Sequence, residues 1–207
     1  GSFELAGSLN FQAFEITYLG AALGFGVNEA YISGGGGFRL NKYEIFGGAF
    51  FGRACSIDPI KLWDPHVGSA LGPPPFTGAY TYGEIWFPIN ELIGIPSSCF
   101  FNLAGGFGMG AGFFVEGPTA IGKIKYGVSG DLLCILSFKG ELTGIAKVEI
   151  PDLTDGGVAS LADQLVDGLT IKAVGKLTGS IGPCPICLKG SKSAALLYKN
   201  RKWKFEH

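Results

Sequence analysis

Apolar and polar residues alternate with a period of two over most of the chain. The alternation is clearest in residues 3–11, 123–132, 138–150 and 169–181, where charged or hydroxyl side chains separate apolar ones. Successive side chains of a β-strand point to opposite sides of its sheet. The pattern therefore predicts strands with one buried apolar face and one solvated polar face.

Two further segments combine a bulky face with a face that has almost no side chains. In residues 101–115 glycine occupies most even positions, and residues 19–27 repeat the arrangement. Glycine weakens a strand through entropy and lost packing. We therefore expect a backbone, an aromatic ring or a ligand to approach these bare faces closely, or the sheet to curve strongly there. The predicted interface or ligand-binding residues are Gly20, Gly24, Gly26, Phe107, Gly108, Met109, Gly110 and Gly112.

The predicted fold class is all-β with a minor α component. Further strands at about 28–33, 37–54, 78–88 and 184–199 bring the total to roughly ten, mostly joined by short turns. We expect an antiparallel meander that forms a barrel or a two-layer sandwich, because either arrangement deals with exposed strand edges.

Two segments depart from the strand pattern. Apolar residues at helical spacing predict one short amphipathic helix near 156–167, which we expect to cover one end or face of the sheet. The stretch 56–77 contains two Asp-Pro pairs and three consecutive prolines, which favour turns, so we predict one long ordered loop. Its expected anchors on the body are Leu62, Trp63, Val67 and Leu71.

Composition changes the expected surface. Only 16% of the 207 residues are charged and 35 are glycine, whereas about a quarter of a typical soluble domain is charged. Several apolar strand faces must therefore meet a second sheet, a ligand cavity, a neighbouring domain or a membrane. A net charge of −1 and a small number of arginines argue against a nucleic-acid partner.

We expect residues 1–207 to form a single β-rich domain cut from a longer protein, because Gly1-Ser2 resembles a cleavage scar. The charge-free run from Leu92 to Val115 is long enough for a membrane helix. Its proline and its glycines at a spacing of two favour a strand instead. No signal-peptide pattern is visible, and a location of the parent protein outside the cytoplasm is favoured.

Five cysteines leave at least one without a partner in the chain. Cys184 and Cys187 flank a predicted turn between strands, which favours a local disulfide there; buried thiols and other pairings remain open. A redox pair needs a helix N-terminus and zinc needs further ligands. We therefore expect no metal and no cofactor.

Catalytic residues are difficult to assemble from this sequence. Asp58, Asp64, His66 and Glu84 could form a hydrolytic site, but no nucleophile-elbow motif accompanies them. The glycine runs lack the strand–loop–helix context of a phosphate loop. Tyr80, Tyr82 and Trp86 alternate on one strand and predict a cross-strand aromatic ladder, with a sugar-stacking or groove-lining row as the alternative.

Three functions are consistent with these patterns. The first is a non-catalytic structural or interaction module of a larger exported assembly, with a neighbouring domain or subunit as its partner. The second is a β-barrel or clam-like binder of a lipid or other apolar small molecule. The third is a hydrolase that uses the Asp58–Glu84 region. Membrane contact is possible but less favoured.

Overall fold

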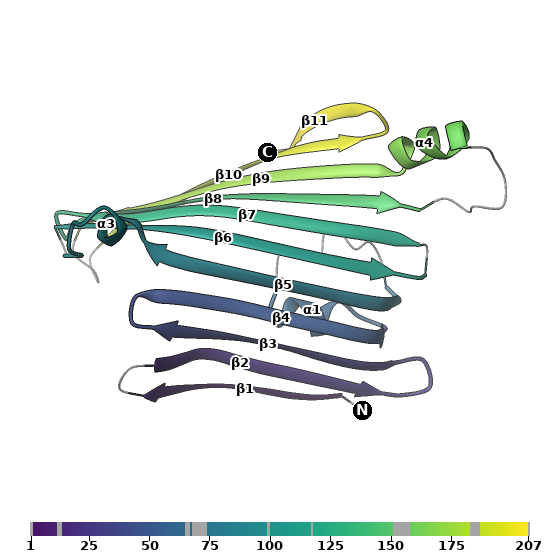
Figure 1. Cartoon of the computed structure of the whole chain (residues 1–207), viewed down its shortest axis with the longest axis horizontal. Coiled ribbons are helices and arrows are strands. Elements are labelled where there is room, and N and C mark those ends of the chain that lie inside the picture. Colours follow the sequence, from purple (N-terminus) through teal and green to yellow (C-terminus); the bar gives the residue numbers. More distant parts are fainter. Residues whose placement is uncertain are drawn as a thin grey trace.

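The computed structural model describes residues 2–11, 14–64, 67, 74–98, 100–116, 118–150, 158–182 and 187–206. Within them, eleven strands form one antiparallel sheet in which each strand pairs with its neighbours in sequence (Figure 1). This confirms the predicted all-β meander. The strands are β1 (Ser2–Phe11), β2 (Phe14–Phe25), β3 (Ala30–Leu40), β4 (Tyr43–Ala54), β5 (Phe76–Pro88), β6 (Phe101–Phe114), β7 (Thr119–Leu132), β8 (Leu136–Glu149), β9 (Leu169–Ile181), β10 (Leu188–Lys199) and β11 (Lys202–Glu206).

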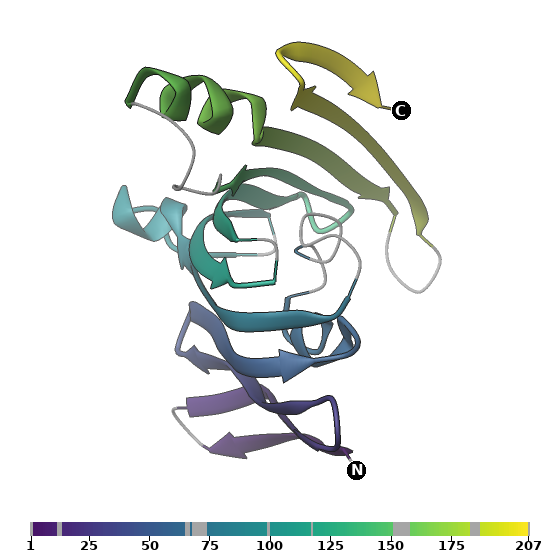
Figure 2. The same cartoon turned by 90° about the vertical axis from the view of Figure 1, so that its right-hand side faces the viewer.

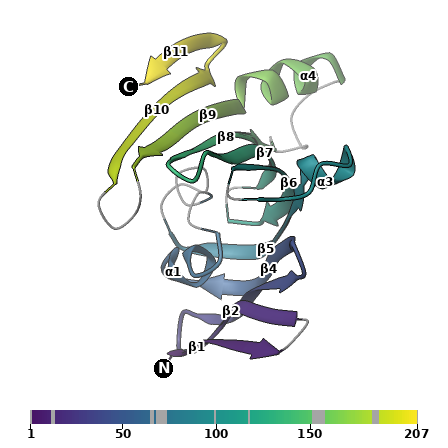
Figure 3. The same cartoon turned by 90° about the vertical axis from the view of Figure 1, so that its left-hand side faces the viewer.

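The sheet is open. Its two outermost strands, β1 and β11, do not pair with each other, so the described strands form one layer and the predicted closure into a barrel is wrong. Figures 2 and 3 show that the sheet curves around the side on which the short helix α1 (Asp58–Lys61) lies. We call this side the inner face, which includes Tyr80, Tyr82, Glu84 and Trp86 of β5, and the opposite side the outer face.

Two hairpin turns were missed by the sequence pattern. The predicted strand 37–54 is divided at Asn41, whose φ of 55° is left-handed, and the glycine run that precedes it lies inside β3. Near the C-terminus, Asn200 and Arg201 both have positive φ and form the turn that leads into β11, a strand that was not predicted. Two consecutive residues of this conformation match the twist of antiparallel strands.

The predicted helix is present as α4 (Val158–Asp167). It lies beyond the N-terminal end of β9, at one end of the sheet (Figure 1). Arg201 in the β10–β11 turn bonds to Asp163 and Asp167 at 3.1 and 2.7 Å, which connects α4 to that hairpin. A third helix, α3 (Ile89–Leu92), follows β5. None of the helices in the described part of the chain has the length and hydrophobicity needed to cross a membrane.

The core lies between the inner face and the segment that contains α1. Trp63 and Val67 are fully buried, as expected for anchors, and Leu62 packs against the same cluster. Ile60, which was not among the expected anchors, is fully buried as well. The Trp63 ring stacks on Tyr80 with centroids 5.6 Å apart, and its indole N–H donates to Ser33 Oγ at 2.8 Å. Leu71, the fourth expected anchor, lies outside the described residues.

Glycines of the inner face make room for these aromatic rings. A Cβ on Gly48 would lie 2.3 Å from Trp63, and a Cβ on Gly106 or Gly127 would lie 2.4 Å from Trp86. The bare faces predicted from the sequence are therefore in close contact with rings. On the outer face, by contrast, a Cβ on Gly122 would meet nothing within 4 Å.

We predict that Gly48→Ala lowers the free energy of unfolding by about 1–3 kcal/mol, because the methyl group overpacks a ring that cannot move aside. Urea unfolding followed by circular dichroism measures the effect. The matched control is Gly122→Ala, which should be neutral or stabilising because the new methyl group has space. Equal losses for both variants would contradict the steric explanation.

Candidate functional site

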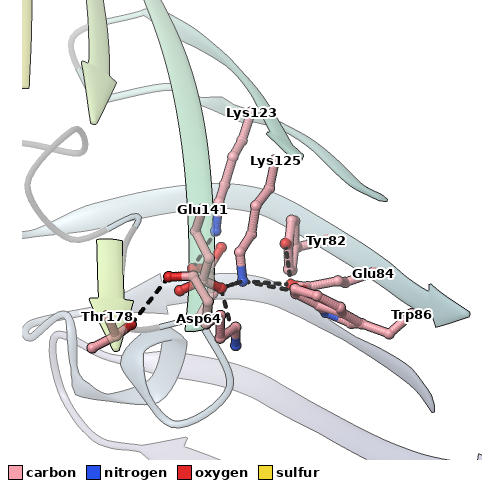
Figure 4. A network of polar contacts seen from close by, with 9 residues as sticks. Asp64, Tyr82, Glu84, Trp86, Lys123, Lys125, Glu141 and Thr178 are labelled. Atoms are coloured by element: carbon pink, nitrogen blue, oxygen red, sulfur yellow. Dashed lines mark hydrogen bonds and ion pairs between the residues drawn. The ribbon is translucent and has the colours of Figure 1, made fainter. Parts of the chain in front are cut away.

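A network of buried charges occupies the inner face (Figure 4). Its first part joins Lys123 of β7 to Asp64, which follows α1, with Nζ and Oδ1 2.6 Å apart and both side chains 1% exposed. The Tyr80 hydroxyl donates to the other carboxylate oxygen of Asp64 at 2.7 Å. The Lys123 ammonium also lies 3.9 Å from the centre of the Tyr82 ring.

The second part of the network is centred on Lys125. Its ammonium contacts Glu84 at 2.9 Å and Glu141 of β8 at 2.7 Å, so one lysine joins two carboxylates. Glu84 also accepts hydrogen bonds from the Tyr82 hydroxyl and the Trp86 indole N–H. Lys139 completes the chain of charges with a contact to Glu141 at 3.3 Å.

The bare inner side of β6 makes these contacts possible. Neighbouring strands lie about 4.8 Å apart, so β5 and β7 are separated by the full width of β6. At the level of the network, the β6 residues on this side are all glycine, among them Gly108 and Gly110. The rings of β5 and the lysines of β7 therefore meet above β6, on the concave side of the curve.

Burial and pairing shift the titration of this network. Burial opposes ionisation of Glu84 and Glu141, but hydrogen bonds from their donors outweigh it and hold the pKa of both carboxyls below the ordinary value. Burial also acts against the charge of Lys125, yet its two carboxylate partners raise its pKa. For Lys123, burial dominates and lowers the pKa. Burial likewise raises the pKa of the Tyr80 and Tyr82 hydroxyls, which stay protonated donors.

The residues proposed for hydrolysis are only partly brought together. Asp64 and Glu84 both lie in the network, where each carboxylate is neutralised by a lysine and bonded to a tyrosine. Asp58 starts α1, and His66 lies outside the described residues. In the part of the chain that the structure describes, no cluster of three acidic, histidine or cysteine side chains could hold a metal ion. The arrangement is that of a fold-stabilising ion-pair network.

Lys123 and Lys125 were missed because their alternation with apolar residues predicts a solvated polar face. The structure reverses that expectation. Lys123 is buried, whereas the adjacent Ile124, on the outer face, is 49% exposed. No local signal shows which face of such a strand is covered, since the partner Asp64 is far away in the sequence.

The outer face is predominantly apolar across β2–β11. The pairing registers of β2–β11 place only two charged residues on it, Arg53 and Lys192, within the described strands. Its large exposed side chains are Leu19, Phe25, Ile32, Phe38, Leu40, Tyr43, Phe51, Ile85, Met109, Phe113, Ile124, Tyr126, Val128, Leu132, Leu136, Leu142, Leu177, Ile181, Leu188, Trp203 and Phe205. Monomeric soluble proteins rarely leave such a continuous patch uncovered.

The predicted interface residues divide between the two faces. Phe107 and Met109 lie on the outer face, whereas Gly108, Gly110 and Gly112 lie on the inner face near the rings of Tyr80 and Tyr82. Two more inner-face glycines, Gly20 and Gly24, lie beneath Tyr18 and Tyr31, and Gly26 lies in the β2–β3 turn, opposite Glu29.

An open depression of about 770 Å³ crosses the outer face from β7 to β10. Gly140 and Gly175 provide its floor, and Tyr126, Leu142 and Leu177 are among the residues that line it, together with Lys192. The lining is mostly apolar, and it also includes Glu141, Lys176 and Ser193, which the pairing registers place on the inner side of their strands. Sequence reasoning did not find it because its walls come from four strands.

Three of the five cysteines, Cys55, Cys134 and Cys187, lie in the described part of the chain. Cys55 is a free, exposed thiol, whereas Cys134 and Cys187 are each disulfide-bonded. The pairing of Cys184 with Cys187 stays a prediction, because Cys184 lies outside the described residues.

Comparisons with known proteins give no assignment. No family model, no curated protein and no solved structure matches this chain significantly.

We predict that Lys123→Met lowers the free energy of unfolding by about 3–5 kcal/mol, because it leaves the Asp64 carboxylate buried without a counter-charge. The double variant Lys123→Met/Asp64→Asn should be less destabilised than this single variant. Lys147→Met is the matched control, since its partner Glu149 is largely exposed and the loss should stay within about 1 kcal/mol. Urea unfolding of the three variants measures these free energies. A decrease of less than about 1 kcal/mol for Lys123→Met would refute the stabilising role of the ion pair.

We predict that stability falls as the pH drops below about 4.3, the ordinary pKa of glutamate. Glu84 and Glu141 have lowered pKa values in the folded state, so the unfolded state takes up protons first. Their contribution is present above the unfolded pKa and is lost as the pH falls through the folded one. Unfolding between pH 3 and 7 measures the slope, which should be shallower in Lys125→Met. An unchanged slope in that variant would count against the coupling.

Proposed function

We propose that this chain is a non-catalytic structural or interaction module of a larger assembly, and that it works by burying the outer face of its sheet. The observation that carries the proposal is the continuous apolar outer face, which has two charged residues across the described strands β2–β11. Burial of apolar surface is the main favourable contribution to most associations. A neighbouring domain or subunit is the partner class expected from the sequence.

The contents of the inner face support this proposal. The α1 segment, the aromatic rings and the lysine–carboxylate network cover that side from β3 to β8, and the exposed inner-face side chains of β9 and β10 are polar, among them Lys176 and Lys189. A partner that needs apolar contact must therefore use the other side.

The open edges of the sheet support it as well. Strand β1 has only one neighbour, and β11 pairs with Ala195–Lys199 alone, within the described strands. The outer backbone groups of an edge strand can pair with an added strand from another chain. Addition at either edge would extend the same apolar face into a wider wall.

Binding of an apolar small molecule is the second candidate, and the depression across β7–β10 favours it. Such a ligand would lie on the outer side of the sheet and not in the enclosed interior that the sequence suggested. The hydrolytic alternative has less support, because Asp64 and Glu84 are already paired with lysines.

A Cys184–Cys187 disulfide belongs to the same proposal. Cys187 lies between Gly182 and Leu188, in the connection from β9 to β10. A local disulfide would fix the turn at that end of the sheet, as suits a module that acts outside the cytoplasm.

We predict that the wild-type chain associates with itself in the absence of a partner and binds a fluorescent hydrophobic dye. The double variant Leu142→Lys/Leu177→Lys should remain monomeric and bind less dye, because it charges two exposed positions of the outer face. Lys176→Glu is the control, since it changes an exposed residue of the same strand on the inner face. Light scattering measures association. A wild-type chain that stays a compact monomer and binds no dye would disprove the proposed function.

A further inference from the structure

We propose that the outer face is covered by hydrocarbon, the acyl chains of a lipid layer. The inference rests on the proposed function, in which the outer face is the working surface, and it names what lies against that surface. Four features of the outer face favour hydrocarbon over a protein partner: its chemistry, its area, its shape and the position of the nearest charges.

The chemistry of the outer face offers almost no hydrogen bonds. Across the described strands β7, β8 and β9, the only polar side-chain atom on this face is the Tyr126 hydroxyl. Protein–protein interfaces carry about one hydrogen bond per 100–200 Å² and have a polar rim. Acyl chains neither donate nor accept hydrogen bonds, so they match a surface of this kind.

The area of the outer face exceeds that of an ordinary protein interface. Strands β2–β11, at a spacing of about 4.8 Å and a length of about 40 Å, give an area on the order of 1,700 Å². A standard interface buries about 800 Å² of each partner. A single domain of similar size would leave much of the outer face uncovered, whereas a lipid layer has no such limit.

The shape of the outer face also suits a fluid partner. The sheet curves toward α1, so the outer face is the convex side (Figures 2 and 3). Large side chains such as Ile124 and Leu177 alternate with open positions at Gly122 and Gly190. A rigid protein partner must have side chains that fit each of these openings, whereas flexible acyl chains can fill openings of any shape.

Charged groups gather at the ends of the strands. Arg53 bonds to Glu116 at 2.8 Å beside the β6–β7 turn, and Arg201 bonds to Asp167 at the turn before β11. At the opposite end, Lys42 of the β3–β4 turn pairs with Glu91. The apolar band is therefore bounded by ion pairs, which could lie among headgroups and water. Lys192 is the exception, because it lies across from Leu177 within the band, and its long side chain would have to extend out of the band to reach an anionic headgroup.

Adjacent residues of β9 provide a matched test. Lys176 and Leu177 are both exposed and lie on opposite faces of the same strand. Each is replaced by tryptophan (Lys176→Trp or Leu177→Trp) in the full chain, which also carries Trp203→Phe to remove the native outer-face indole. The remaining tryptophans, Trp63 and Trp86, belong to the inner face and give a constant background.

The probe is a vesicle of phosphatidylcholine and phosphatidylglycerol in which the phosphatidylcholine is brominated on an acyl chain. Bromine quenches only indoles that contact it. We expect loss of emission for Leu177→Trp and none for Lys176→Trp, with circular dichroism confirming β-structure in both. If Leu177→Trp fails to fold, Met109→Trp replaces it, because Met109 is 60% exposed on the same face.

Equal quenching of both variants, or quenching of neither, would overturn the lipid inference. If neither is quenched but the wild type forms oligomers that Leu142→Lys/Leu177→Lys abolishes, the occupant is protein and the proposed function stands. If neither is quenched and the wild type is a compact monomer that binds no dye, both the inference and the proposed function fail.

Discussion

The Lys123–Asp64 pair lies where side chains from two strands and a connecting segment meet above a third strand that presents glycine. Removing two unit charges from water costs several kcal/mol for each ion, so these charges must be matched closely. That requirement draws the segment after α1 down onto the sheet and places Trp63 against Gly48. The same segment carries Trp63, which stacks on Tyr80, so the ion pair and the aromatic layer hold one part of the chain against the concave side of the sheet.

The burial of charged residues on one face of a sheet determines which residues lie on the opposite face. Because side chains alternate strictly along a strand, a strand that places Lys123 and Lys125 inward must place Ile124 and Tyr126 outward. A shift of the strand by one residue would only exchange its two faces, so the lysines and the apolar residues cannot be buried on the same side. The same reasoning applies to β8, where Glu141 and Leu142 point to opposite faces. The exposed apolar face is therefore a direct consequence of the buried network.

The positions of most strands could be predicted from the periodicity of apolar residues in the sequence. Which face of each strand is covered by the rest of the chain could not. The alternation around Lys123 shows that the two faces of β7 differ, and it predicts the position of the strand. It cannot show which face meets solvent, because that depends on Asp64, which lies outside every strand. The turn at Asn41 was missed although the sequence carries a local signal, since the apolar positions change from even numbers before Asn41 to odd numbers after it.

The space around the glycines differs between the two faces of the sheet. On the inner face, Gly48 and Gly106 are required by contacts within the chain, because a ring occupies the place of their side chains. On the outer face, a Cβ added to Gly122 or Gly190 would have nothing within 4 Å, so the described fold gives no reason for a missing side chain there. A glycine in an exposed strand position costs stability relative to alanine. The proposed burial of the outer face gives these open positions a use, because the atoms that cover the face can enter them.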